Sequence, residues 1–332
     1  MKGIRLAAAV FAVAALTTGM PAWAADCGKA GAISISEMTW PSSGMLAHLT
    51  AKILQKGYGC EVQVTPGDTV PTASTMLTRG TPDIVPELWI SLVPDVWKQI
   101  EEKGSYFAVA DTYKDGVAEG LWIPRYLAEK HPEIKSITDL GKGDNWKLFT
   151  EPSSPDKGVL YACPPGWGCE VTIPQYYKAL GLQEKFKLFS PGSGGAMKAN
   201  IVRRLEQKEP IVTYYWSPTD LVGKYDMVML ESPAHDEQQW LCITDPNCPD
   251  PKPTGYKPGI TKLVAASRLK EDAPDVVAYL EKQTIPNEVV NKLLAWADEN
   301  KASTEDMANR FLQEHGDVWQ SWLPDDVAAK LK

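Results

Sequence analysis

Short apolar segments alternate with amphipathic ones along most of the chain. Near the N-terminal end, apolar residues recur at Leu46, Leu49, Ile53 and Leu54, a spacing typical of a helix. Ser42 or Ser43 caps this helix, and the glycines of 57–59 end it. The resulting β-α-β-α-β order predicts a mostly parallel sheet flanked by helices, in the α/β class. We expect strands over 32–36, 61–64 and 83–89, and a second helix over 71–79.

The same alternation continues to the C-terminus and indicates a second α/β lobe. About 300 residues exceed what one hydrophobic core usually holds, which also favours two lobes. We place lobe 1 at 25–124 and 256–332, and lobe 2 at 125–255, with the chain crossing near Trp122 and near Tyr256. We expect strands over 121–124, 146–150, 187–189, 210–216, 228–230 and 261–266, helices over 172–180 and 197–207, a loop over 235–256, and mainly helices from Ala273 onward.

The N-terminal segment reads as a secretory signal. Lys2 and Arg5 precede an apolar run over 6–16, and a small-residue site follows at 22–24. We expect cleavage after Ala24, which makes residues 1–24 a signal peptide and the protein a free periplasmic one. The apolar run is shorter than the ~18 residues that a membrane-spanning helix needs.

Charge and cysteine content narrow the range of partners. The net charge is −8, and no basic stripe is present, which argues against nucleic acid as a partner. All six cysteines follow the signal, as expected in an oxidising compartment. Six cysteines allow about 15 pairings. Proximity in sequence favours Cys163–Cys169 and Cys242–Cys248, which leaves Cys27–Cys60.

Tryptophan usage points to a binding site. The chain has 12 Trp but only 6 Phe, although Phe fills a core equally well. Ligands of open α/β sheets bind beyond the carboxyl ends of the strands. Trp167 lies in a loop, flanked by Gly166 and Gly168 and closed by two cysteines, so its face is open. Indole faces attract soft cations. The other indoles at or just after predicted strand ends are Trp40, Trp89, Trp122 and Trp216.

Four segments give the chain a family resemblance. They are Cys-Pro-Pro-Gly-Trp-Gly-Cys-Glu at 163–170, Ser-Gly-Gly-Ala-Met at 193–197, Lys-Glu-Pro-Ile-Val at 208–212 and Tyr-Tyr-Trp-Ser-Pro at 214–218. The chain resembles the substrate-binding proteins of ABC importers for glycine betaine, proline betaine and choline. The resemblance implies a two-lobed hinged periplasmic-binding-protein fold, a box of aromatic rings between the lobes, and a membrane permease as partner. By matched position it implies Trp89, Trp167 and Trp216 as box residues, with Trp40 and Trp122 as further candidates.

One position departs from the family pattern and bears on the ligand. Val93 stands where the resemblance implies a histidine that holds a ligand carboxylate, while the backbone amides of Gly168 and Cys169 resemble the rest of that clamp. A carboxylate of the protein would repel a betaine but can share a proton with an N-oxide. We therefore rank trimethylamine N-oxide first, glycine betaine second and choline third. The candidate carboxylates are Glu37, Glu87 and Glu151, of which we favour Glu151.

Other functions are less compatible with the sequence. A secreted enzyme would need a nucleophile, but Pro191 breaks the G-x-S-x-G pattern around Ser193. A sugar-binding protein of the same fold remains an alternative, and it would need many polar groups in the cleft. We expect a monomer without cofactor. Calcium is a conceivable ligand of the acidic loop that contains Asp245, Asn247 and Asp250.

Overall fold

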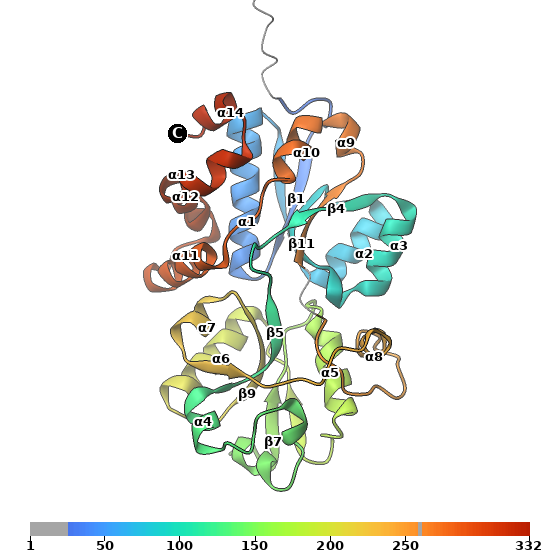
Figure 1. Ribbon diagram of the computed structural model, residues 1–332, viewed down its shortest axis with the longest axis vertical. Helices are drawn as coiled ribbons and strands as arrows, with labels where there is room; N and C mark the ends of the chain where they lie inside the picture. Colours follow the sequence, from blue (N-terminus) through green and yellow to red (C-terminus); the bar gives the residue numbers. More distant parts are fainter. Residues whose placement is uncertain (1–25, 258–260) are drawn as a thin grey trace, which may run out of the picture.

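A computed structural model describes residues 26–257 and 261–332, which fold into two α/β lobes, one above the other in Figure 1. Each lobe holds one sheet with helices packed on it. The predicted signal peptide lies outside the described residues. Within them, no helix is both long enough and apolar enough to cross a membrane.

The sheet of lobe 1 has the strand order β2-β1-β3-β11-β4. The first strand is parallel to β2 and β3, whereas β11 is antiparallel to both of its neighbours. Because β1 and β3 are parallel neighbours, their carboxyl ends meet at one edge of the sheet, and that edge faces lobe 2. The bounds are β1 Ile33–Met38, β2 Val62–Gly67, β3 Ile84–Trp89, β4 Tyr106–Asp111 and β11 Thr261–Ala266.

Helices cover both faces of this sheet. Pro41 begins α1, as suits a residue without a backbone N–H, and left-handed glycines at 80 and 104 end α2 and α3. Helices from the C-terminal end of the chain pack beside α1 (Figure 1). The bounds are α1 Pro41–Lys52, α2 Thr69–Arg79, α3 Pro94–Lys103, α9 Leu269–Asp272, α10 Pro274–Leu280, α11 Asn287–Asn300, α12 Thr304–Glu314, α13 Gly316–Trp319 and α14 Asp325–Ala329.

The sheet of lobe 2 has the order β10-β5-β9-β7-β6, with β8 paired to β7. Here β7 is parallel to β8 and β9, and the remaining pairs are antiparallel. The strands are β5 Ala118–Pro124, β6 Thr150–Glu151, β7 Ser154–Tyr161, β8 Phe186–Phe189, β9 Val212–Ser217 and β10 Met227–Met229. The helices are α4 Arg125–Lys130, α5 Cys169–Ala179, α6 Gly194–Glu206, α7 Asp220–Lys224 and α8 Glu237–Ile243.

The two-lobed α/β class is confirmed, but both sheets are mixed rather than mostly parallel, because each combines parallel with antiparallel pairs. Three further details differ from the prediction. Because β5 pairs with β9 and β10, residues 118–124 belong to lobe 2, and the chain leaves lobe 1 before Ala118 rather than near Trp122. Residues 145–149 form a 3-10 helix instead of a strand. The expected loop over 235–256 contains α8. An apolar run predicts a strand but not the sheet that it joins, which explains the misplaced boundary.

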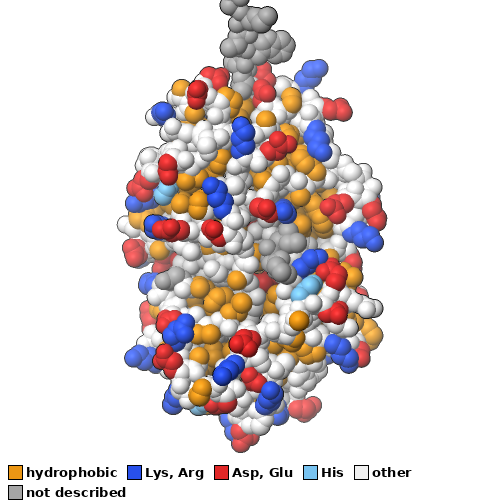
Figure 2. Space-filling model, in the orientation of Figure 1, with side chains coloured by type: hydrophobic (Ala, Val, Ile, Leu, Met, Phe, Trp, Pro, Cys, Tyr) orange, Lys and Arg blue, Asp and Glu red, His pale blue; other side chains and the backbone are white. Residues whose placement is uncertain are grey.

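The three disulfides pair as proximity suggested: Cys27–Cys60, Cys163–Cys169 and Cys242–Cys248. On the face shown in Figure 2, Lys and Arg side chains are interspersed with Asp and Glu over both lobes. One hydrophobic core lies in lobe 1 and includes buried residues of α1 and of the C-terminal helices. A second core extends from lobe 1 into lobe 2. The second core includes the indoles at the boundary between the lobes, so apolar packing is continuous across the cleft.

Candidate functional site: an indole pocket between the lobes

Four indoles from two lobes meet where the carboxyl ends of parallel strands face each other. Trp40 lies just after β1, and Trp89 is the last residue of β3. On the other lobe, Trp216 lies near the end of β9, and Trp167 lies in the loop between β7 and α5. Parallel pairing of β1 with β3 and of β7 with β9 is what brings these four side chains to one place.

These indoles surround a small cavity, here called the indole pocket. The space between the lining residues is about 260 Å³, which includes the part that is open to solvent. The Trp167 ring stands edge-on to Trp40 at 5.6 Å and to Trp216 at 5.1 Å between centroids. Its lining consists of Trp40, Thr69, Trp89, Leu92, Trp167, Gly168, Cys169, Tyr214 and Trp216.

Backbone and side-chain contacts hold the two lobes together around the pocket. The indole N–H of Trp167 donates to Thr39 Oγ1 at 2.8 Å, and that hydroxyl donates to Asp68 Oδ1 at 2.6 Å. The amide of Val70 donates to the carbonyl of Gly166 at 3.1 Å. Two of these contacts join the loop that carries Trp167 to lobe 1. The third, from Thr39 to Asp68, holds the hydroxyl group that accepts the Trp167 N–H. The structure is therefore that of a closed pair of lobes.

The loop around Trp167 is built for close approach. Gly166 has φ +87°, a conformation that favours glycine, and its amide donates to Glu170 Oε2 at 2.7 Å. A Cβ on Gly168 would lie 2.4 Å from the Cβ of Leu92 in lobe 1, so only glycine fits there when the lobes are closed. Gly168 and Cys169 begin α5, where backbone amides have no acceptor within the helix. Both residues line the pocket.

The carboxyl group of Glu87 accepts hydrogen bonds from two of the pocket indoles. Its Oε1 accepts the indole N–H of Trp40 at 2.9 Å and that of Trp89 at 3.1 Å. The side chain is fully buried, with an exposed fraction of 0%. Burial raises the pKa of the Glu87 carboxyl above its ordinary value, and the hydrogen bonds that it accepts act in the opposite direction. Both indoles of lobe 1 are thus oriented by one carboxyl group.

A second buried carboxyl group, Glu119, lies beside the indoles of lobe 2. It is the direct partner of Trp216 in the antiparallel β5–β9 pair, so both side chains are on the same face of the sheet. Its Oε2 accepts the hydroxyl of Tyr214 at 2.8 Å, whereas its buried Oε1 has no hydrogen-bond partner among the described residues. Burial raises the pKa of Glu119 to about 7, while the hydrogen bond from Tyr214 lowers it.

The structure brings together most of the residues singled out in the sequence. Trp40, Trp89, Trp167 and Trp216 line the pocket, together with Gly168 and Cys169. Trp122 does not, because its indole N–H donates to the carbonyl of Tyr215 at 3.0 Å within the sheet of lobe 2.

Glu151, the favoured carboxylate, is also away from the pocket. It forms an ion pair with Arg204 and accepts the hydroxyl of Tyr161 at 2.7 Å. Val93 precedes α3 and is not part of the lining either. Sequence reasoning missed Tyr214, Thr69 and Leu92, and it did not consider Glu119. The run 214–218 that carried the resemblance contains Tyr214, two residues from Trp216 and hence on the same face of its strand.

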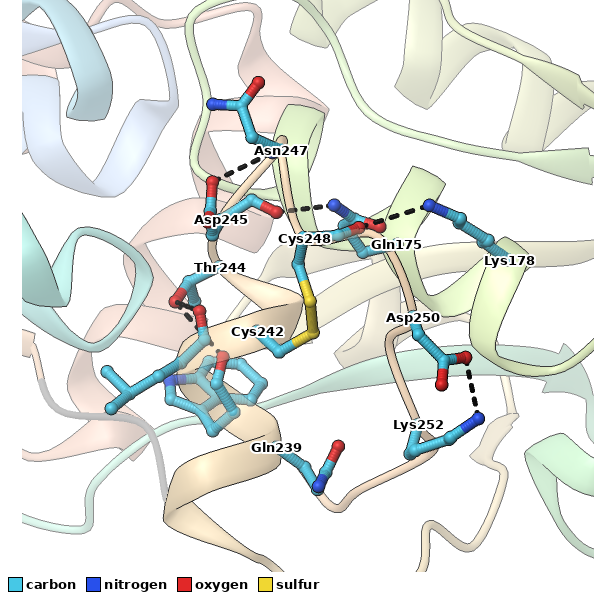
Figure 3. Close-up of a disulfide and its surroundings, with 12 residues drawn as sticks. Gln175, Lys178, Gln239, Cys242, Thr244, Asp245, Asn247, Cys248, Asp250 and Lys252 are labelled. Carbon is cyan, nitrogen blue, oxygen red and sulfur yellow. Dashed lines mark hydrogen bonds and ion pairs between the residues drawn. A yellow bond between two sulfur atoms is a disulfide. The ribbon is translucent and has the colours of Figure 1, made fainter.

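The acidic loop considered for calcium is held by its own hydrogen bonds (Figure 3). Asp245 Oδ1 accepts the amide of Asn247 at 2.8 Å, and Asp250 pairs with Lys252 at 2.7 Å. Lys178 donates to the carbonyl of Cys248 at 3.1 Å, which ties the loop to α5. In the described ranges, no three His, Cys, Asp or Glu side chains are placed to hold one metal ion.

Two α/β sheets with a pocket between them are typical of two-lobed solute-binding proteins. Residues 31–314 match the family model for the substrate binding domain of the ABC-type glycine betaine transport system. The chain belongs to this family.

Curated relatives cover most of the chain at low identity. Over 226 residues the chain is 26% identical to a glycine betaine/proline betaine-binding periplasmic protein of Salmonella typhimurium, covering 66% of this chain and 67% of the relative. Over 291 residues it is 23% identical to a trimethylamine N-oxide-binding protein of Pelagibacter ubique, covering 86% and 89%.

Solved structures share the fold. A glycine betaine/L-proline-binding protein from Borrelia burgdorferi superposes with a TM-score of 0.70 at 16% identity, covering 91% of this chain and all of that one. Lactococcal OpuAC, closed around glycine betaine, superposes with a TM-score of 0.67 at 18% identity, covering 89% and 100%. At these identities the likeness shows the fold alone.

Proposed function

We propose that this protein is the periplasmic ligand-binding component of an ABC importer and captures a small trimethylated ammonium solute in the indole pocket. The observation that carries the proposal is the convergence of four indoles, two from each lobe, on about 260 Å³ of free space. A membrane permease that receives the closed form is the implied partner.

The physics of the pocket favours such a solute. A trimethylammonium group has no N–H to donate, so hydrogen-bond acceptors alone hold it poorly, whereas its methyl groups carry diffuse positive charge that matches the faces of indoles. Each desolvated contact contributes about 1–2 kcal/mol. Three or four such contacts contribute about 3–8 kcal/mol together. Micromolar binding corresponds to ~8 kcal/mol after the ordering cost, so burial of the apolar methyl groups has to supply the remainder.

Glu119 favours trimethylamine N-oxide as the first choice. A carboxyl group with a pKa of about 7 is partly protonated near neutral pH, and it can then donate to an N-oxide oxygen. The same group in its charged form would repel the carboxylate of glycine betaine. Glu119 is not itself part of the pocket lining, but it lies across the strand pair from the lining residue Trp216 and bonds to the lining residue Tyr214. Its unpartnered Oε1 is the atom that we assign to this hydrogen bond.

Glycine betaine is the second choice, because Gly168 and Cys169 line the pocket at the start of α5, where backbone amides suit a carboxylate. Choline is the third. A sugar would need many hydrogen-bonding side chains, yet Thr69 and Tyr214 are the only lining residues with a side-chain hydroxyl, among a set dominated by indoles.

The first experiment is calorimetric titration of the mature protein with trimethylamine N-oxide, glycine betaine and choline in parallel. Tight binding of the N-oxide with weaker binding of the other two supports the assignment of Glu119. A preference for glycine betaine shows that the amides of α5 dominate instead. Absence of binding for all three overturns the proposed function.

A further inference from the structure

Glu87 is placed to act on the ligand without touching it. It lies in β3, two residues before Trp89, and it is not part of the pocket lining. The Trp40 and Trp89 indoles donate to its Oε1, and Ser42 Oγ and the Tyr113 hydroxyl donate to its Oε2 at 3.0 and 2.7 Å. Four donors therefore surround one carboxyl group that is closed off from solvent.

The ionised form of this carboxyl group can accept all four of these donors. A carboxylate offers about four lone-pair sites, and an indole N–H can only donate. Two indoles on Oε1 leave that oxygen no room for a proton. The hydroxyls of Ser42 and Tyr113 supply the two remaining donors on Oε2. Charge-assisted hydrogen bonds of this kind are about twice as strong as neutral ones, and they compensate a buried charge.

We propose that Glu87 is the specificity-determining charge of the indole pocket: a buried carboxylate that fixes the tilt of Trp40 and Trp89 and makes the pocket prefer a cation. The inference rests on the proposed function, since it explains how that site selects its ligand. A negative charge behind two rings adds to the negative potential of their faces, and the complete burial of Glu87 limits screening by solvent. Glu87 is therefore a positioning residue that acts through the two indoles.

The variant Glu87→Gln tests the charge with little change of shape. Its amide oxygen can still accept from both indoles, and its NH₂ group can donate to the oxygens of Ser42 and Tyr113. The probes are three molecules of similar shape: tetramethylammonium with a net charge of +1, trimethylamine N-oxide with none but a strong dipole, and neutral tert-butanol.

We expect the affinity of Glu87→Gln for tetramethylammonium to fall about tenfold, the affinity for the N-oxide to fall less, and that for tert-butanol to stay unchanged. An equal loss for all three probes, or no loss for any, overturns the inference. The matched control is Tyr113→Phe, which removes one hydrogen bond but keeps the charge. It should leave the ratio of the three affinities as in the unaltered protein, and a shift of that ratio toward tert-butanol would also contradict the inference.

A second measurement keeps the inference testable if Glu87→Gln does not fold. Carbon-13 NMR of the unaltered protein labelled at glutamate carboxyl carbons reports the ionisation of Glu87 directly, and a protonated carboxyl group at pH 7 overturns the inference. Its failure is distinguishable from that of the proposed function. If the unaltered protein binds none of the three probes, the proposed function fails and the inference falls with it. If the unaltered protein binds the probes and Glu87→Gln leaves the ratio of the three affinities unchanged, the inference alone fails.

Discussion

Replacement of Gly168 by Ala should block closure of the lobes while sparing the open form. Gly168 has helical backbone angles, φ −60° and ψ −31°, so alanine is compatible with the backbone of lobe 2. In the closed structure, however, the new Cβ would lie 2.4 Å from the Cβ of Leu92 and 2.8 Å from its Cδ1, both in lobe 1. Carbon atoms pack at about 3.5–4.0 Å, so the lobes would have to separate by roughly 1 Å.

The magnitude follows from the cost of overpacking. Inserting a methyl group into a well-packed contact costs about 1–3 kcal/mol. Because only the closed form pays this cost, ligand affinity should fall by about 5- to 150-fold. The free energy of unfolding of the ligand-free protein should change little, because the backbone angles of Gly168 suit alanine and the open lobes can accept its methyl group.

Calorimetry gives the affinity, and small-angle X-ray scattering at saturating ligand reports whether the lobes close. The matched control is Gly192→Ala in the same lobe, where a Cβ would meet nothing within 4 Å. We expect the control to bind and close like the unaltered protein, and Gly168→Ala to bind weakly and to scatter as a more open particle. Unaltered affinity together with full closure of Gly168→Ala would refute the reasoning, because the lobes of the bound form could not then approach as this structure shows.

Three further outcomes follow from the site. Trp167→Leu, which keeps apolar bulk but removes one aromatic face, should weaken ligand binding by about 5- to 30-fold by calorimetry, whereas Trp122→Phe should bind normally. Above pH 7 the affinity for trimethylamine N-oxide should decline as Glu119 loses its proton, and Glu119→Gln should abolish this pH dependence. In the ligand-free protein, the same raised pKa should make the free energy of unfolding, measured by urea titration, fall as the pH rises from about 4 to 7. The reason is that the folded state still holds a proton that the unfolded chain has released. Asp298→Asn removes the partner that pairs with Lys198 across the lobes, and should cost up to about fivefold in affinity at low salt but nothing at high salt, where an ion pair half open to solvent is screened.

The indoles of the site could be predicted from sequence because their position depends on local order. Trp89 ends an apolar strand, and Trp167 stands between two glycines in a loop closed by cysteines. In a parallel sheet, the end of a strand is enough to place a residue at the ligand-binding edge. Such a prediction requires only the position and direction of the strand itself, and it does not require knowledge of which strand lies beside it. That is why four of the five tryptophans proposed from sequence line the pocket, while Trp122, inside a strand, does not.

The carboxylates could not be placed in this way, because their role depends on which strand lies beside them. Glu119 has no distinguishing neighbour in sequence, and only the register that sets it opposite Trp216 brings it beside that indole. Glu151 lies at the end of an apolar run much as Trp89 does, yet Arg204, 53 residues away in sequence, neutralises it (204 − 151). Glu87 could be recognised at a strand end in the sequence. Its role, however, depends on the hydrogen bonds that it accepts from Trp40 and Tyr113, which belong to two other segments. A buried charge is tolerated only where several segments supply donors to it, so its function is a property of the assembled sheet rather than of any stretch of sequence.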